Sequence, residues 1–167
     1  MNTSSNPIES AKRTFETYKG LADKAMAQVS DDEFFRFPES ESNSIAFIVK
    51  HVAGNLMSRW TDFLSSDGEK PWRNRDAEFE SDSKGRATIL SEWEEGWICL
   101  FRALGSLTQQ DLPKIVTIRN EPHSVLEAIN RGLAHTSYHV GQIVLLAKLY
   151  KSASWKTLTI PRRKKPD

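Results

Sequence analysis

The stretch His135-Thr136-Ser137-Tyr138-His139 lies in the middle of the longest helical pattern in the sequence. Apolar residues recur around it at spacings of three and four, which predicts an amphipathic helix. Two histidines four residues apart lie on one face of such a helix, one turn apart. A third histidine, His51, lies at the edge of the apolar stripe of an earlier predicted helix. These positions predict a site where imidazoles from two helices meet inside a helical bundle.

Four segments have the apolar spacing that is typical of amphipathic helices. Their bounds are roughly 8–29, 44–65, 86–104 and 124–150. Four such helices in one chain of 167 residues predict an all-α fold, a four-helix bundle in a single domain over 1–167. We expect the termini, 1–7 and 162–167, to be frayed.

Capping residues mark the starts of two predicted helices. Ser124 and Glu127 form a capping-box pattern, and Asn43 or Ser44 can cap the second helix. Gly105 stands where the end of the third helix favours a left-handed residue.

Segments with no helical period connect the helices. We expect a loop over 33–43 and a long connection over 65–85, which Trp72 and Phe79 would anchor to the bundle. Short extended segments are predicted near 114–119 and 157–160, and the second can pair with the first around Val116.

The composition narrows the function classes. The formal net charge is +1, so no basic surface indicates nucleic-acid binding. The basic run Arg162-Arg163-Lys164-Lys165 is interpreted as a solvated terminus. The single cysteine, Cys99, excludes an internal disulfide and fits a reducing compartment as an inert thiol. Residues 1–10 are polar, and no apolar run approaches the ~20 residues of a membrane span, so we expect a cytoplasmic protein.

Neutral imidazole is a common ligand of zinc, nickel, copper and iron. Three histidines with one position left to water form a catalytic zinc arrangement. The four-residue spacing alone is a weak signal, because Thr136 replaces the glutamate of the His-Glu-x-x-His motif. Histidines that hydrogen-bond across a core are the alternative. His123 is left out of the set, since about 18 Å of helix separates it from His135, and we expect it to make a structural contact.

The run His-Thr-Ser-Tyr-His-Val-Gly-Gln-Ile over 135–143, together with His51, resembles the DinB-like superfamily, which includes the YfiT-type thiol transferases. The runs 118–125 and 155–162 resemble one bacterial branch of it, known only as a domain of unknown function. The resemblance implies up-down-down-up connectivity of the four-helix bundle and a homodimer. It also implies a divalent metal, zinc or nickel, held by His51, His135 and His139.

Helix phase places four further polar residues on the histidine stripes: Asn55, Arg59, Arg131 and Gln142. Asn55, Arg131 or Gln142 could orient an imidazole or a metal-bound water. A polar edge of the bundle is the alternative for Arg131 and Gln142. Arg59 could bind an anionic group of a substrate, but an ion pair with a carboxylate is the favoured interpretation.

Three functions stay open at this point. The first is a metal-dependent enzyme that transfers a low-molecular-weight thiol, as a second cofactor, to an electrophilic small molecule. The second is a metal-dependent hydrolase at the same site, and the third is a non-catalytic dimeric bundle that binds a metal or a ligand. The expected partners are a small-molecule substrate and a second copy of the chain, with no nucleic acid and no membrane.

Overall fold

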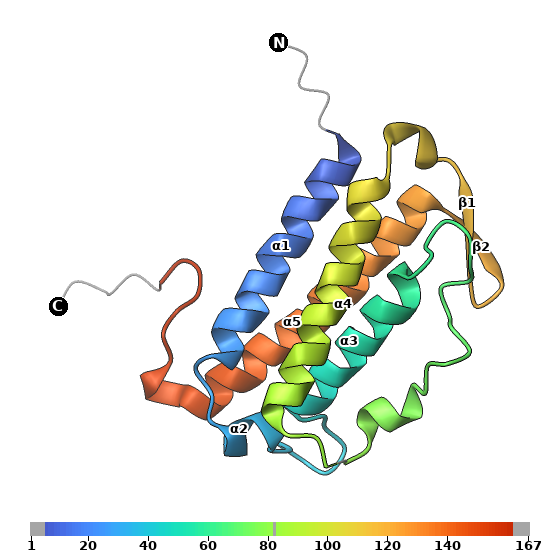
Figure 1. The fold of residues 1–167 in the computed structure, drawn as a ribbon. Helices are drawn as coiled ribbons and strands as arrows, with labels where there is room; N and C mark the ends of the chain where they lie inside the picture. Colours follow the sequence, from blue (N-terminus) through green and yellow to red (C-terminus); the bar gives the residue numbers. More distant parts are fainter. Residues whose placement is uncertain (1–5, 82, 162–167) are drawn as a thin grey trace.

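The computed structural model describes residues 6–81 and 83–161. The described chain is mostly helical, with five α-helices and a small two-stranded sheet (Figure 1). The elements are α1 (Pro7–Met26), α2 (Asp31–Phe35), α3 (Ile45–Trp60), α4 (Arg86–Ser106), β1 (Ile115–Ile118), β2 (Glu121–Ser124) and α5 (Val125–Lys151). Short 3-10 turns lie at Asp76–Phe79, Gln109–Asp111 and Ser152–Ser154.

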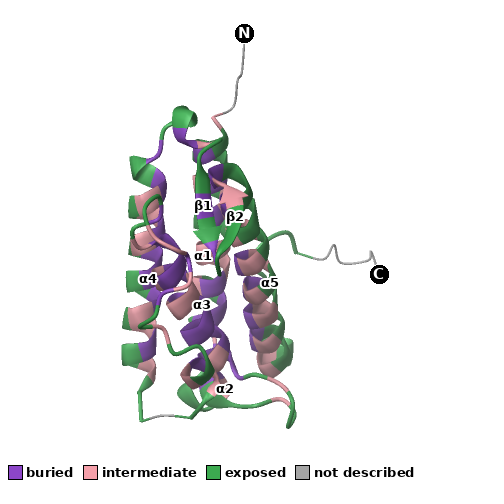
Figure 2. Ribbon diagram, turned by 90° about the vertical axis from the view of Figure 1, so that its right-hand side faces the viewer, coloured by how far each residue is buried: buried purple, intermediate pink, exposed green. Residues whose placement is uncertain are grey.

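The four long helices lie side by side (Figure 1). Helix α3 packs mainly against α4, α1 packs mainly against α5, and α3 also contacts α5. Their buried faces point inward (Figure 2), and Phe15, Trp93 and Trp97 are among the largest fully buried side chains. The prediction of a mostly helical fold is therefore confirmed.

Helices α3 and α4 approach closely at Gly96. A Cβ atom added at Gly96 would lie 3.0 Å from the carbonyl oxygen of Ala53 in α3. Because the neighbouring atom belongs to the backbone, a larger side chain could fit only if a helix moved. Gly96 therefore sets the distance between these two helices.

Strands β1 and β2 form an antiparallel hairpin in which Val116 pairs with His123. Its tip is Arg119 and Asn120, with φ of 56° and 63°, the left-handed conformations of a tight two-residue hairpin turn. The carboxylate of Asp67 accepts hydrogen bonds from the backbone N–H groups of both tip residues, at 2.9 and 2.8 Å. The connection between α3 and α4 is thereby tied to the hairpin.

Both predicted caps are confirmed. Ser44 accepts a hydrogen bond from the backbone N–H of Phe47 at the start of α3. Ser124 and Glu127 form the reciprocal capping box of α5. The second helix is shorter than predicted, because the chain turns out of the helix at Trp60 and Asp62 has a positive φ of 48°.

Several expectations for the connections are wrong. The predicted loop 33–43 begins within α2, which the Ser30–Glu33 capping box starts. Gly105 lies inside α4, and no glycine in the described residues has a positive φ. Trp72 is 59% exposed rather than buried against the bundle. Residues 157–160 form no strand, and Val116 pairs with His123 of β2 instead.

The expectation for the termini needs one correction. Asn6 caps α1 and Pro7 is its first residue, so the ordered helix begins inside the segment 1–7. The remaining expected frayed residues, 1–5 and 162–167, lie outside the described residues. None of the described helices is long and apolar enough to cross a membrane.

Candidate metal centre

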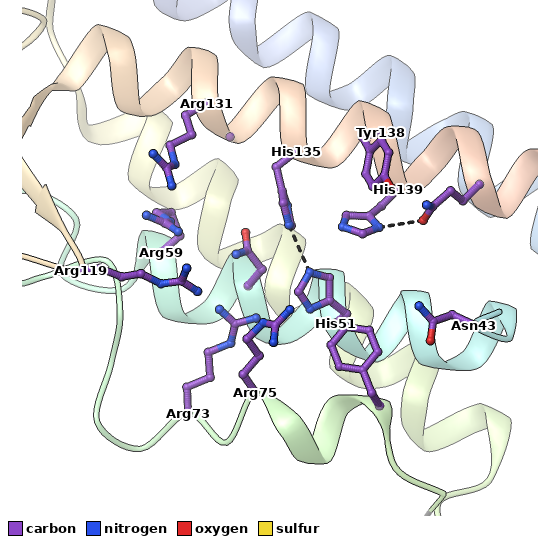
Figure 3. Close-up of a pocket in the computed structure, with 14 residues that line it drawn as sticks. Asn43, His51, Arg59, Arg73, Arg75, Arg119, Arg131, His135, Tyr138 and His139 are labelled. Atoms are coloured by element: carbon purple, nitrogen blue, oxygen red, sulfur yellow. Dashed lines mark hydrogen bonds between the residues drawn. The ribbon is translucent and has the colours of Figure 1, made fainter. Parts of the chain in front are cut away.

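Helices α3 and α5 bring three of the four histidines together (Figure 3). Nε2 of His51 lies 3.1 Å from Nε2 of His135, and one ring nitrogen of each of His51, His135 and His139 lies within 4.8 Å of the others. Two nitrogens bound tetrahedrally to one zinc ion at 2.0–2.1 Å are roughly 3.3 Å apart. The group could therefore hold a metal ion.

The far nitrogens of two rings have partners that fix the tautomer. Nδ1 of His51 lies 2.9 Å from Oε2 of Glu78, and Nδ1 of His139 lies 3.0 Å from Oε1 of Gln142. Each oxygen accepts a hydrogen bond, so Nδ1 carries the proton in both rings. Nε2 of His51 and Nε2 of His139 are therefore left as lone-pair donors, as metal ligation requires.

Glu78 comes from the 3-10 turn in the long connection between α3 and α4. Arg73 donates to both of its oxygens, at 2.8 and 2.9 Å. Burial opposes ionisation of Glu78, but the hydrogen bonds from His51 and Arg73 and the charge of Arg73 hold its pKa below the usual range. Phe79 packs its ring 4.9 Å from that of His51. A Cβ atom at Gly54 would collide with Oε1 of Glu78. The absence of a side chain at Gly54 therefore leaves space for this carboxylate beside α3.

Two imidazoles of the group resist protonation. Burial, with the nearby His139 and His51, lowers the pKa of His135 to about 3. Burial also lowers the pKa of His139, against the opposing effect of its hydrogen bond with Gln142. Both rings are therefore neutral near pH 7, the state in which imidazole binds zinc or nickel.

The histidines line a cleft of about 560 Å³. The cleft also receives five arginines, from α3, the long connection, the hairpin tip and α5: Arg59, Arg73, Arg75, Arg119 and Arg131 (Figure 3). No aspartate or glutamate is among the described residues that line it. The cleft thus combines a possible metal site with a group of arginines.

The prediction that Arg59 forms an ion pair with a carboxylate is wrong. Within the described parts of the chain, no carboxylate lies within ion-pair distance of Arg59, although its side chain is buried. Its Nη1 atom is buried and has no hydrogen-bond partner. Burial and the charge of Arg131 lower the pKa of Arg59 to about 10, so the guanidinium is still charged at pH 7.

The other residues chosen from helix phase also reach the cleft. Asn55 and Arg131 line it, and Gln142 both lines it and contacts His139. His123 lies in β2, outside the group, as expected. Cys99 lies outside the cleft, with Sγ 3.4 Å from the Thr61 hydroxyl.

The polar residues of the site that sequence reasoning missed include Glu78, Arg73, Arg75 and Arg119. They come from the irregular connection and the hairpin tip, where no period assigns a side chain to a face. For the residues between α3 and α4, the unusual length of that connection was the only signal.

Comparisons with known proteins place the chain in a family. No curated protein and no solved structure matches the chain. Residues 2–164 match the profile of the family described as "Protein of unknown function (DUF1572)". The match covers nearly the whole chain, which therefore belongs to the DUF1572 family.

Proposed function

We propose that this protein is a metal-dependent enzyme that transfers a low-molecular-weight thiol to an electrophilic small molecule. The observation that carries the proposal is the open three-histidine group, in which partners at Nδ1 leave Nε2 of His51 and His139 free to bind a metal. The cleft above it has room for a small substrate.

Zinc or nickel bound by the three imidazoles would lower the pKa of a coordinated thiol and so supply a nucleophile near pH 7. In the transfer, the sulfur forms a bond to the electrophilic carbon, the leaving group departs with its bonding pair, and the thiol proton passes to solvent. Glu78 is engaged by His51 and Arg73, so its role is to hold an imidazole rather than to act as a base.

The proposal includes the DinB-like assignment, with an up-down-down-up four-helix bundle. The packing of α1 on α5 and of α3 on α4 supports this connectivity, as does the long connection that α3 needs to reach α4. A small two-stranded hairpin is then an addition between the last two helices of the bundle.

We also propose that a second copy of the chain packs on the outer face of α5. Tyr138, Leu145 and Leu149 are each more than 60% exposed there. No aspartate, glutamate, lysine or arginine occurs from 132 to 147, so this face lacks the charges of an ordinary solvated helix. Tyr138 also lines the cleft, which therefore opens beside the proposed interface.

The test is thiol-dependent turnover by zinc- or nickel-loaded protein. Cysteine and glutathione are supplied with 1-chloro-2,4-dinitrobenzene, and the thioether product is followed by its absorbance. We expect activity that requires both metal and thiol, is lost in His135→Ala and is kept in His123→Ala, which changes the histidine outside the group. Metal-dependent turnover of ester substrates without thiol would instead identify a hydrolase.

A further inference from the structure

We propose that the arginine end of the cleft binds a dianionic phosphate group, so that the substrate is a phosphate monoester or phosphonate. The reacting part of this molecule would face the three histidines. The inference deepens the proposed function, because it names the substrate class of the same cleft, and it rests on that function.

Arg59 is the centre of this anion site. Its side chain is only 9% exposed, and its buried Nη1 atom has no hydrogen-bond partner. Arginine is almost never buried without a partner, since an unpaired buried charge is costly. Nη1 itself lies against Gly68, but Arg59 also lines the cleft, so an anion bound there can pair with the charge of the guanidinium.

The charge count favours a dianion. Three of the five arginines already contact carboxylates, as Arg73 with Glu78, Arg119 with Glu69 and Arg75 with Asp76. Arg59 and Arg131 have no carboxylate within 4.0 Å among the residues that the structure describes. Two guanidinium groups without a carboxylate in direct contact match a phosphate monoester, which carries about −1.5 to −2 at pH 7 and offers three acceptor oxygens. A single carboxylate would neutralise only one of them.

The site lies at a fixed distance from the histidines. Arg59 is eight residues after His51 on α3, and Arg131 is four residues before His135 on α5. At 1.5 Å of rise per residue, these separations are roughly 12 and 6 Å along the helix axes. Arg59 on α3 and Arg131 on α5 lie on the same side of the three histidines (Figure 3). The substrate therefore spans roughly 6–12 Å between its phosphate and its reacting atom.

The hairpin between α4 and α5 contributes a third arginine to the proposed anion site. Arg119 lines the cleft from the hairpin tip, and Asp67 holds its backbone N–H at 2.9 Å. Nε of Arg119 donates a hydrogen bond to Glu69 at 3.1 Å. The guanidinium has further N–H groups that can donate to an anion. Planar guanidinium groups bind phosphate oxygens in pairs, which gives the site its preference for a compact oxyanion.

The experiment is calorimetric titration of inorganic phosphate into metal-free protein, at pH 7.5 and constant ionic strength, with acetate as the competing monoanion. Removing the metal first ensures that bound phosphate reports on the arginines. The variants are Arg59→Gln and Arg131→Gln, with Arg102→Gln, on exposed α4 surface outside the cleft, as the matched control. We expect phosphate to bind the wild type and the control equally, and the dissociation constant to rise at least about tenfold in each cleft variant.

Absence of phosphate binding to the wild type overturns the inference, as does equal binding by all variants or equal competition by acetate. Arg131 is exposed, so Arg131→Gln keeps the test valid if the buried Arg59→Gln variant does not fold. Metal content is measured separately on the untreated protein. Metal uptake without phosphate binding overturns this inference alone, whereas phosphate binding by a protein that takes up no metal supports the anion site and contradicts the proposed metal enzyme.

Discussion

Glu78 lies 2.9 Å from Nδ1 of His51 through Oε2, although the two residues are 27 positions apart in the sequence. Arg73 holds the same carboxylate with two hydrogen bonds. The long connection between α3 and α4 thus reaches back to orient one imidazole of the three-histidine group. This contact links the stability of the connection to the state of the proposed metal centre.

Replacing the carboxylate tests its role directly. Glu78→Gln keeps an acceptor for His51 but removes the negative charge and frees Arg73. Removing such an outer contact of a ligating histidine costs roughly ten- to a hundred-fold in metal affinity. We expect zinc affinity to fall by that factor in a competition titration with a chelating dye. Glu121→Gln, on the exposed hairpin, should leave the affinity unchanged.

A glycine substitution reaches the same contact from the other side. The Cβ atom of Gly54→Ala would collide with Oε1 of Glu78 and push the carboxylate away from His51. We expect weaker zinc binding without loss of the helical circular dichroism signal, because alanine is the better helix former. Gly20→Ala in α1 meets nothing within 4 Å and serves as the control. Unchanged zinc affinity in Gly54→Ala would show that Glu78 is not needed where the structure places it.

Much of the helical fold follows from the sequence. The apolar period identified all four long helices, and the Ser124–Glu127 capping box located the start of α5. The period could not locate the end of α3, since apolar residues such as Phe63 continue past Trp60 and are buried without being helical. Only β1 of the hairpin was predicted. Glu121 and Pro122 give β2 no strand-like pattern, and its pairing depends on the turn at Arg119 and Asn120.

The candidate site also has a part that the sequence predicts and a part that it does not. Helix phase brings His51, His135 and His139 to facing stripes, and it also selects Asn55 and Gln142. The residues that complete the cleft, Glu78 above all, depend on tertiary contacts of an irregular segment. The burial of Arg59 without an ion pair could not be foreseen either. The sequence offers many carboxylates and does not show that, among the described residues, none lies within ion-pair distance.

The close approach of α3 and α4 gives a stability prediction. Gly96→Val places methyl groups against the backbone of Ala53 and overpacks the contact. Overpacking of this kind costs about 1–3 kcal/mol, so we expect the free energy of unfolding in urea to fall by that amount. Gly105→Val in the same helix meets open space and should change the stability by less than about 1 kcal/mol. Equal stabilities of the two variants would contradict the packing described for Gly96.

The proposed dimer face makes a prediction for oligomeric state. Leu145→Glu combined with Leu149→Glu introduces two charges into the exposed apolar face of α5. We expect light scattering after gel filtration to give the mass of a dimer for the wild type and of a monomer for the variant. Ile98→Glu, an exposed apolar position on α4, should leave the dimer intact. A monomeric wild type would rule out the second copy.

The central claim, a metal held by three histidines, is tested most directly by mass-spectrometric metal analysis of untagged protein purified without chelator. We predict close to one zinc or nickel ion per chain in the wild type and in His123→Ala. The ion should be lost in folded His51→Ala and in folded His135→Ala. A wild-type protein that carries no metal and takes up neither added zinc nor added nickel would contradict the claim. The three imidazoles would then be hydrogen-bonding groups of the helical core.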